Sequence, residues 1–289
     1  MNRKSIIENI KVKAKDFRRQ IVEITYRSGK AHIGSALSCI DIVATLYLGI
    51  LRLSPRNPRQ AKRDRFILSK GHGCLALYTL LAERGYLKKD ALYSFCQFGT
   101  ALGGHPDMQL IPGAEVSSGS LGHGLSIGLG MAIAGAVDKS KYKVYVLLGD
   151  GECEEGSVWE AVMAAPHFQA DNLAAIVDNN GLQVLDTVDN TISTLEPLAE
   201  KFRTFGWEVK EIDGHNIRQI LDTLSSVPFK KGKPSCIIAH TIKGRGVSFM
   251  ENQLNWHYRG LSKEEYAQAL KEIEEGRGHQ RHQSHQRHR

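Results

Sequence analysis

The amino-acid sequence predicts an α/β fold, a doubly wound and mostly parallel sheet with helices on both faces. Five short apolar runs, each about as long as one strand, alternate with stretches that have helical spacing. Chains with this alternation form parallel sheets whose two faces are both covered by helices. Ligands of such sheets bind at the carboxyl ends of the strands, so the residues that follow each run are the first candidates for a functional site.

The predicted elements begin with an amphipathic helix near the start of the chain. Its apolar residues recur at helical spacing, with acids among the bases, unlike a signal peptide (Ile6, Ile7, Ile10, Phe17, Ile21 and Ile24). Strands are expected at the runs RFILS (65–69), YKVYVLLG (142–149), LAAIVDN (173–179), WEVKEI (207–212) and SCIIAHT (235–241). Further helices are expected at 72–84, 121–137, 156–168, 195–205, 216–226 and 262–275. We expect no apolar run of about 18 residues and therefore no membrane span.

Composition and charge narrow the possible function classes. The chain has 289 residues, of which 42% are hydrophobic, as in an ordinary globular protein. Its net charge of +7 falls to +3 without the four arginines of the last 13 residues, so we expect no nucleic-acid partner. The five cysteines contain no Cys-x-x-Cys pair and are expected to be reduced thiols of a cytoplasmic protein. One domain is expected over residues 1–275, followed by a disordered His- and Arg-rich tail over 276–289.

The strongest candidate for a site lies at the end of the second strand. There Gly149-Asp150-Gly151 makes a sharp turn, and Asn180 follows the next strand thirty positions later. Neighbouring parallel strands end at the same edge of the sheet, so these side chains can meet. A carboxylate, an amide oxygen and a free backbone carbonyl just after Asn180 suit a hard divalent cation that also holds phosphate oxygens. Mg²⁺ or Ca²⁺ fits this set best.

The turn belongs to a longer series of motifs. Gly149-Asp150-Gly151 followed by Asn180 resembles the thiamine diphosphate-binding signature. The stretches RSGKAHIGSALS, RDRFILSKGHGCLALY, GGHPDMQLIPGAEVSSGSLGHGLSIGLGMA, GDGECEEGSVWEA and KGRGVSFMENQLNWH occur in the order seen in the amino-terminal half of transketolases. The similarity covers about residues 5 to 275, so the chain is identified as a member of the transketolase family.

The resemblance implies a role for each matching residue. Asp150, Asn180 and the carbonyl of Leu182 resemble the ligands of the metal, and Gly149 and Gly151 resemble the turn that binds the diphosphate. His72 and His257 match histidines that approach the diphosphate and the reacting centre, whereas His32 and His105 match histidines that contact the ketose donor. Gly119 and Leu121 are possible contacts of the aminopyrimidine end. His167, His215 and His240 match no motif and are expected to be structural or solvated.

Glu155 also matches a transketolase residue, but one that lies at a subunit interface rather than beside the substrate. With Gly156, Ser157 and Glu160 it matches transketolase rather than the two-oxoacid dehydrogenase alpha subunits. In transketolases this position belongs to a hydrogen-bond network that links two active sites across a subunit interface. The resemblance therefore implies a catalytic and cofactor-linked role for Glu155. Its simpler interpretation is an acid at a helix start, favoured by the helix dipole.

The resemblance also implies an activity and a partner. The glutamate that acts on the cofactor's pyrimidine ring lies in a second domain of transketolases, and we expect the chain to be the amino-terminal subunit of a split transketolase. Such an enzyme transfers a two-carbon ketol unit from a ketose phosphate to an aldose phosphate, as in pentose phosphate metabolism, and is expected to be a heterotetramer of two copies of each chain. The alternatives are another thiamine diphosphate enzyme, either a specialised sugar transketolase or a two-oxoacid decarboxylating complex, and a regulatory module without turnover.

Overall fold

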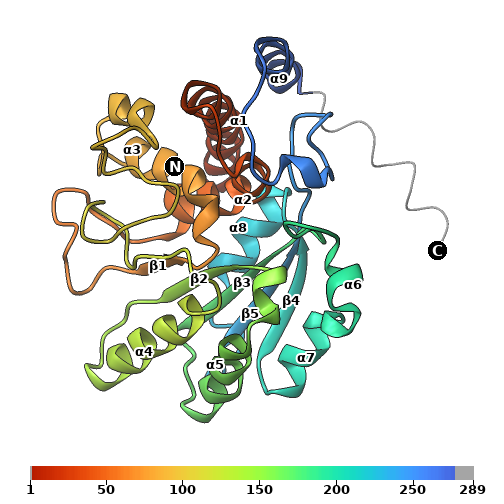
Figure 1. Ribbon diagram of the computed structural model, residues 1–289. Helices are drawn as coiled ribbons and strands as arrows, with labels where there is room; N and C mark the ends of the chain where they lie inside the picture. Colours follow the sequence, from red (N-terminus) through yellow and green to blue (C-terminus); the bar gives the residue numbers. More distant parts are fainter. Residues whose placement is uncertain (1, 277–289) are drawn as a thin grey trace.

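The computed structural model describes residues 2–276 and has a five-stranded sheet at its centre (Figure 1). The strand order is β1-β2-β3-β5-β4, and every neighbouring pair is parallel. The strands are β1 (Arg65–Leu68), β2 (Val144–Gly149), β3 (Leu173–Asn179), β4 (Glu208–Asp213) and β5 (Ser235–His240). All five predicted strands are therefore confirmed within one or two residues at each end.

Helices cover both faces of the sheet, as the sequence predicts. Side chains alternate along each strand, so Tyr145 and Leu147 face one core and Val144 and Val146 face the other. The first core includes α1 (Arg3–Ser28), α2 (Ile33–Thr45), α3 (Cys74–Glu83), α8 (Ile217–Ser225) and α9 (Lys263–Glu275). The second includes α4 (Gly124–Val137), α5 (Gly156–His167), the short α6 (Val188–Thr191) and α7 (Leu198–Thr204). The central strands, apolar on both faces, are buried between these layers (Figure 1).

One core helix, α2, lies outside the predicted elements. All thirteen of its residues are buried, so it has no polar face to produce a helical period in the sequence. A π-helical turn, Leu46–Ile50, continues it. The expectation that the chain has no long apolar run is wrong, because Ile33–Ile50 is long and apolar enough to cross a membrane by length and composition. Of this segment 83% is buried inside the protein, as in the core helix of a soluble fold.

The ends of several helices differ from the sequence prediction for local reasons. Gly71–Gly73 forms a 3-10 turn, so that α3 begins only at Cys74. Pro197 precedes α7, which begins at Leu198 rather than at residue 195. Helix α9 begins at the predicted place, because Ser262 and Glu265 form a capping box. Gly276 closes α9 in the left-handed region, and the rest of the predicted tail, 277–289, lies outside the described residues.

Candidate active site

The carboxyl ends of β2 and β3 are joined through the side chain of Asp150. Its Oδ2 accepts hydrogen bonds from the backbone N–H groups of Asn180 (2.8 Å) and Gly181 (2.5 Å), and its Oδ1 accepts one from Gly151 (2.8 Å). Asp150 is 4% exposed, and burial with the neighbouring Asp178 raises its pKa to about 6. A buried carboxylate of this kind is stabilised by a cation, which is what the predicted role requires.

The three predicted metal ligands form a partial oxygen site. Asn180 Oδ1 accepts a hydrogen bond from the N–H of Leu182 (3.1 Å), so the amide oxygen and the following carbonyl belong to one tight turn. Among the described residues no group of three or more His, Cys, Asp or Glu side chains could hold a metal on its own. The Leu182 carbonyl is not free as expected, because it accepts a hydrogen bond from Lys243 Nζ (3.0 Å), although a carbonyl oxygen has a second lone pair. One carboxylate, one amide oxygen and one carbonyl fit a hard cation whose remaining ligands are phosphate oxygens or water. The residues therefore fit Mg²⁺ or Ca²⁺ bound with a diphosphate.

Four predicted histidines from four separate loops meet at one cavity. His32 lies at their centre, with ring centroids 5.4 Å from His72, 5.8 Å from His105 and 5.3 Å from His257. Together with Asp150, Gly149, Gly151, Asn180, Leu182, Gly119 and Leu121 they line a cavity of about 250 Å³ at the carboxyl edge of the sheet. The fold therefore brings together residues 225 positions apart in the sequence.

Burial keeps these imidazoles neutral near neutral pH. It lowers the pKa of His32 to about 4 and that of His257 to about 3, and nearby charges add to the effect. The pKa values of His72 and His105 are also lowered, chiefly by burial. A neutral imidazole donates from one nitrogen and accepts at the other, so each ring can handle a substrate hydroxyl or carbonyl without carrying charge.

Gly119 is required by the packing of His105. Its φ of +151° lies in the region that favours glycine, and a Cβ at this position would come within 3.2 Å of the His105 ring. Any other side chain here would strain the backbone and require the His105 ring to shift by a few tenths of an ångström. Gly119 thus supports a predicted substrate-binding residue as well as lining the predicted cofactor site.

Glu155 is the one predicted site residue that the structure places outside the cavity. It is exposed and precedes the first residue of α5, whereas Glu152, three residues earlier, is buried and lines the cavity. The Glu152 carboxylate accepts hydrogen bonds from the N–H groups of Gly122 (2.9 Å) and Gly149 (3.1 Å) and from the Ser69 hydroxyl. The role of Glu155 across a subunit interface stays a prediction, and Glu152 is the acid that shapes the cavity in this chain.

Sequence reasoning missed two buried lysines in the cavity wall. Lys70 is 1% exposed and forms an ion pair with Asp178, which also accepts hydrogen bonds from Ser38 and Thr241. Lys243 is equally buried, and burial lowers its pKa to about 8. Each lysine lies within three residues of the end of a strand, in a motif that also holds a predicted histidine, and this position is the signal that the sequence offers. Two cations in the wall suit an anionic ligand such as a diphosphate.

Three more residues of the cavity lining were not predicted from the sequence, namely Ser35, Gln183 and Val184.

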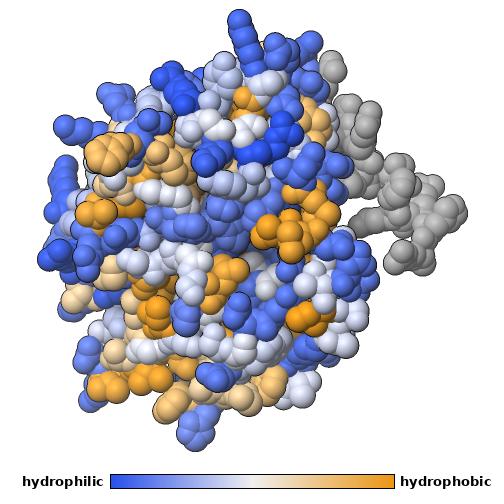
Figure 2. Space-filling model, in the orientation of Figure 1, coloured by the Kyte–Doolittle hydropathy of each residue, from blue (hydrophilic) through white to orange (hydrophobic). Residues whose placement is uncertain are grey.

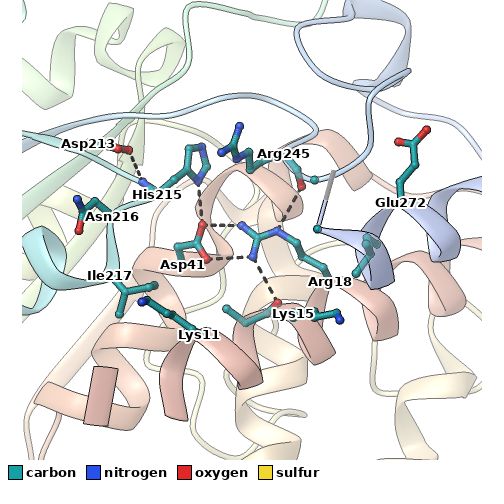
Figure 3. A pocket seen from close by; sticks show the side chains of 14 residues that line it. Lys11, Lys15, Arg18, Asp41, Asp213, His215, Asn216, Ile217, Arg245 and Glu272 are labelled. Carbon is teal, nitrogen blue, oxygen red and sulfur yellow. Dashed lines mark hydrogen bonds and ion pairs between the residues drawn. The ribbon is translucent and has the colours of Figure 1, made fainter. Parts of the chain in front are cut away.

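A second cavity, of about 470 Å³, lies between α1, α9 and the loops that follow β4 and β5 (Figure 3). Its centre is a buried chain of polar groups. Arg18 donates two hydrogen bonds to Asp41 (3.0 and 2.5 Å), and Asp41 Oδ2 lies 2.8 Å from His215 Nδ1. His215 Nε2 accepts a hydrogen bond from the N–H of Ile242 (2.8 Å), one residue before Lys243. His215 is therefore structural, as the sequence predicts, and fixes the backbone beside the first cavity.

Comparison with known proteins identifies the family of the chain. Residues 3–283 match the family model described as the transketolase thiamine diphosphate-binding domain. The chain is 42% identical to one of the subunits of apulose-4-phosphate transketolase from Phocaeicola vulgatus, over 93% of this chain and 95% of that protein. It is 40% identical to the 6-deoxy-6-sulfo-D-fructose transketolase subunit SqwG of a Clostridium species, over 89% and 93% of the two chains.

Solved structures give the same result for the fold. Transketolase from Leishmania mexicana is similar with a TM-score of 0.85 and 28% identity, over 93% of this chain and 41% of that one. The chain thus spans about two fifths of that transketolase but nearly the whole length of the two subunit relatives. The expected fold class and the expected family are both confirmed. The chain belongs to the transketolase family, in which it corresponds to the thiamine diphosphate-binding domain.

Proposed function

We propose that the chain is the amino-terminal subunit of a thiamine diphosphate-dependent transketolase and acts with a separate subunit that carries the pyrimidine domain. The observation that carries the proposal is the meeting of four neutral histidines with the Asp150 turn at one cavity. The proposed reaction moves a two-carbon ketol unit from a ketose phosphate to an aldose phosphate. Relatives that span the same length are named subunits of transketolases that act on sugars, which supports this assignment.

The residues of the cavity divide into two groups in the proposed mechanism. When bound, thiamine diphosphate supplies the reactive carbon to which the two-carbon unit is attached during transfer. Asp150, Asn180 and the Leu182 carbonyl would hold Mg²⁺ or Ca²⁺, and Lys70 lies on the same side of the cavity as a fixed positive charge. Polar groups fixed by the fold in this way need no reorganisation when the anion binds.

The four histidines would orient the substrate and move protons. His32 and His105 would donate hydrogen bonds to the hydroxyls and the carbonyl oxygen of the ketose, and His72 and His257 would lie beside the diphosphate and the reacting centre. The pKa values of all four rings are lowered, so each ring is neutral near pH 7. A neutral ring can accept a proton on one nitrogen and donate one from the other.

A partner chain is supported by the surface around the cavity. Val184 lines the cavity, and the adjoining Leu185 is 89% exposed. Apolar side chains also gather over α4 and α5 (Figure 2), where Ile127, Val137 and Met163 are exposed. Exposed apolar areas of this kind mark sites of association. Association through both areas would give the proposed heterotetramer, with two copies of each chain. All five cysteines are free, which agrees with the proposed cytoplasmic location.

The chemistry can be tested against its alternatives with one set of substrates. The chain is mixed with the pyrimidine-domain subunit of the same organism, thiamine diphosphate and Mg²⁺, and is offered ketose phosphates with an aldose phosphate or two-oxoacids alone. Transfer of two carbons to the aldose is expected, without release of CO₂. Release of CO₂ from a two-oxoacid would instead identify a decarboxylating complex, and no turnover with any substrate would favour the regulatory module.

A further inference from the structure

The Nζ atom of Lys243 has three hydrogen-bond acceptors around it, as many as an ammonium group has N–H donors. Its Nζ lies 3.0 Å from the carbonyl oxygen of Leu182, 3.0 Å from that of Gln183 and 2.9 Å from Nδ1 of His257. An ammonium group has three N–H donors and no lone pair, and a carbonyl oxygen can only accept. All three N–H groups are therefore used, the third of them on His257 Nδ1.

This contact bears on where His257 carries its proton. The ring also faces the Gln183 carbonyl, but that oxygen already accepts a hydrogen bond from Lys243 Nζ (3.0 Å). A neutral imidazole has one N–H, and a proton on Nδ1 would point at the ammonium group of Lys243. We propose that Lys243 is a positioning residue that fixes His257 as the tautomer protonated on Nε2, so that the ring offers a donor to a ligand in the cavity. The inference deepens the proposed function, because only that function says that the ligand is a diphosphate or a reacting oxygen.

The fold holds the Lys243 side chain in place from two sides. Gly34 at the start of α2 packs on its stem, where a Cβ would lie 3.2 Å from Lys243 Cγ and 2.8 Å from the carbonyl oxygen of Trp256. The N–H of Gly244 donates to the carbonyl of Gly34 (3.0 Å). The N–H of the preceding residue, Ile242, donates to His215 Nε2 (2.8 Å). His215 is held in turn by Asp41 (Figure 3). The ammonium group is thus placed by packing and by backbone hydrogen bonds, which keeps it on His257.

The tautomer has a direct chemical consequence. With the proton on Nε2, His257 can donate to an anionic oxygen, and this charge-assisted bond is stronger than one between neutral groups. With the proton on Nδ1, the lone pair of Nε2 would face the same oxygen and repel it. Lys243 therefore acts on the ligand through His257, in addition to any attraction from its own charge.

The test reads the tautomer directly in the chain without cofactor. Histidine is labelled with ¹⁵N in its ring, long-range ¹H–¹⁵N NMR spectra are recorded near neutral pH, and the His257 signals are assigned by their loss in His257→Gln. The wild type is expected to show His257 protonated on Nε2. Lys243→Met keeps the length of the stem and removes the donors, and the Nδ1-protonated tautomer is expected to gain about tenfold relative to the wild type, the size of one charge-assisted hydrogen bond.

Two controls separate this role from general support of the fold. Lys88→Met changes an exposed lysine and is expected to leave the His257 tautomer ratio unchanged. The signals of the other cavity histidines report whether Lys243→Met is folded. A wild type with the proton on Nδ1 would overturn the proposal even if the variant does not fold, and so would an unchanged ratio in a folded Lys243→Met chain. Failure of ketol transfer would leave these spectra unaffected, so the two proposals fail separately.

Discussion

The backbone N–H of Asn180 donates a hydrogen bond to the carboxylate of Asp150 at 2.8 Å, so one side chain joins the end of β2 to the end of β3. The same carboxylate accepts bonds from Gly181 and Gly151, all within a buried turn. It orders the loop that supplies the Asn180 amide and the Leu182 carbonyl before any ligand arrives. Asp150 thus has two functions, one in the geometry of the apo site and one as the proposed metal ligand.

Replacing Asp150 by alanine should weaken the metal-dependent binding of thiamine diphosphate. The variant loses the only carboxylate of the proposed oxygen set, so Mg²⁺-dependent affinity for thiamine diphosphate should fall by at least about 100-fold. Calorimetry with the chain and its partner measures this. Asp138→Ala, an exposed position after α4, is the matched control and should bind like the wild type. Unchanged affinity in Asp150→Ala would remove this residue from the metal site.

Alanine at His32 or His105 should affect the ketose more than the cofactor. If these rings bind hydroxyl and carbonyl oxygens more tightly in the transition state, kcat/KM for the ketose should fall by about 10- to 100-fold, or about 1.4 to 2.7 kcal/mol. The Kd of thiamine diphosphate should change by much less. His240→Ala, at an exposed ring paired with Glu211, serves as the control. An equal loss of cofactor affinity and turnover would mark the two histidines as structural.

The half-buried His32 should make the fold sensitive to acid. Burial lowers its pKa from 6.5 to about 4, so between these values the unfolded chain binds a proton that the folded chain does not. Above about pH 6.5 the neutral His32 does not reduce the free energy of unfolding. As the pH falls toward 4, the proton bound only by the unfolded chain lowers that free energy progressively. Asp150 acts in the opposite direction, because its pKa is raised to about 6.

Comparison with His32→Gln isolates the histidine, since Asp150 is present in both chains. Urea unfolding at about pH 7 and about pH 5 should show that the wild type loses stability relative to the glutamine variant as the pH falls. A difference between the two chains that does not depend on pH would contradict the lowered pKa of His32.

The Arg18–Asp41–His215 chain should be a major source of stability beside the second cavity. Asp41 is buried, and burial opposes its charge, but Arg18 and His215 hold its pKa well below the ordinary value. Asp41→Ala leaves the largely buried Arg18 guanidinium without a carboxylate, with bonds to backbone carbonyls alone, and should lower the free energy of unfolding by about 3 to 5 kcal/mol. Asp222→Ala, which breaks an exposed pair with Arg3, should cost at most about 1 kcal/mol. Equal losses would show that burial of the Asp41 pair is unimportant.

The sheet could be predicted from short-range patterns, and most of the cavity residues from motifs that resemble those of transketolases. The central strands β2 and β3 are buried on both faces, so each is a continuous apolar run. Parallel strands end at a common edge, and this rule alone brings Asp150 toward Asn180. The four histidines lie in distinct glycine-containing loops, which the motifs identify without knowledge of their distances.

The residues that were missed depend on contacts between distant parts of the chain. Helix α2 is buried on every side, so it has no amphipathic period to detect. Lys70 and Lys243 resemble solvated charges in the sequence, and only folding places them against Asp178, 108 positions away, and Leu182, 61 positions away. The exposed position of Glu155 likewise could not be read from its motif, which describes a site between two subunits.

The requirement for a second subunit is the central claim, and one assay tests it most directly. Both carboxylates in the lining of the described cavity, Asp150 and Glu152, are already bound by backbone N–H groups at the ends of β2 and β3, so a carboxylate for the far end of the cofactor must come from elsewhere. Ketol transfer from a ketose phosphate is measured with thiamine diphosphate and Mg²⁺, using the purified chain, its purified pyrimidine-domain partner and the mixture of the two. Turnover is predicted in the mixture alone and should be lost when Asp150→Ala replaces the wild-type chain. Full turnover by the single purified chain would contradict the account.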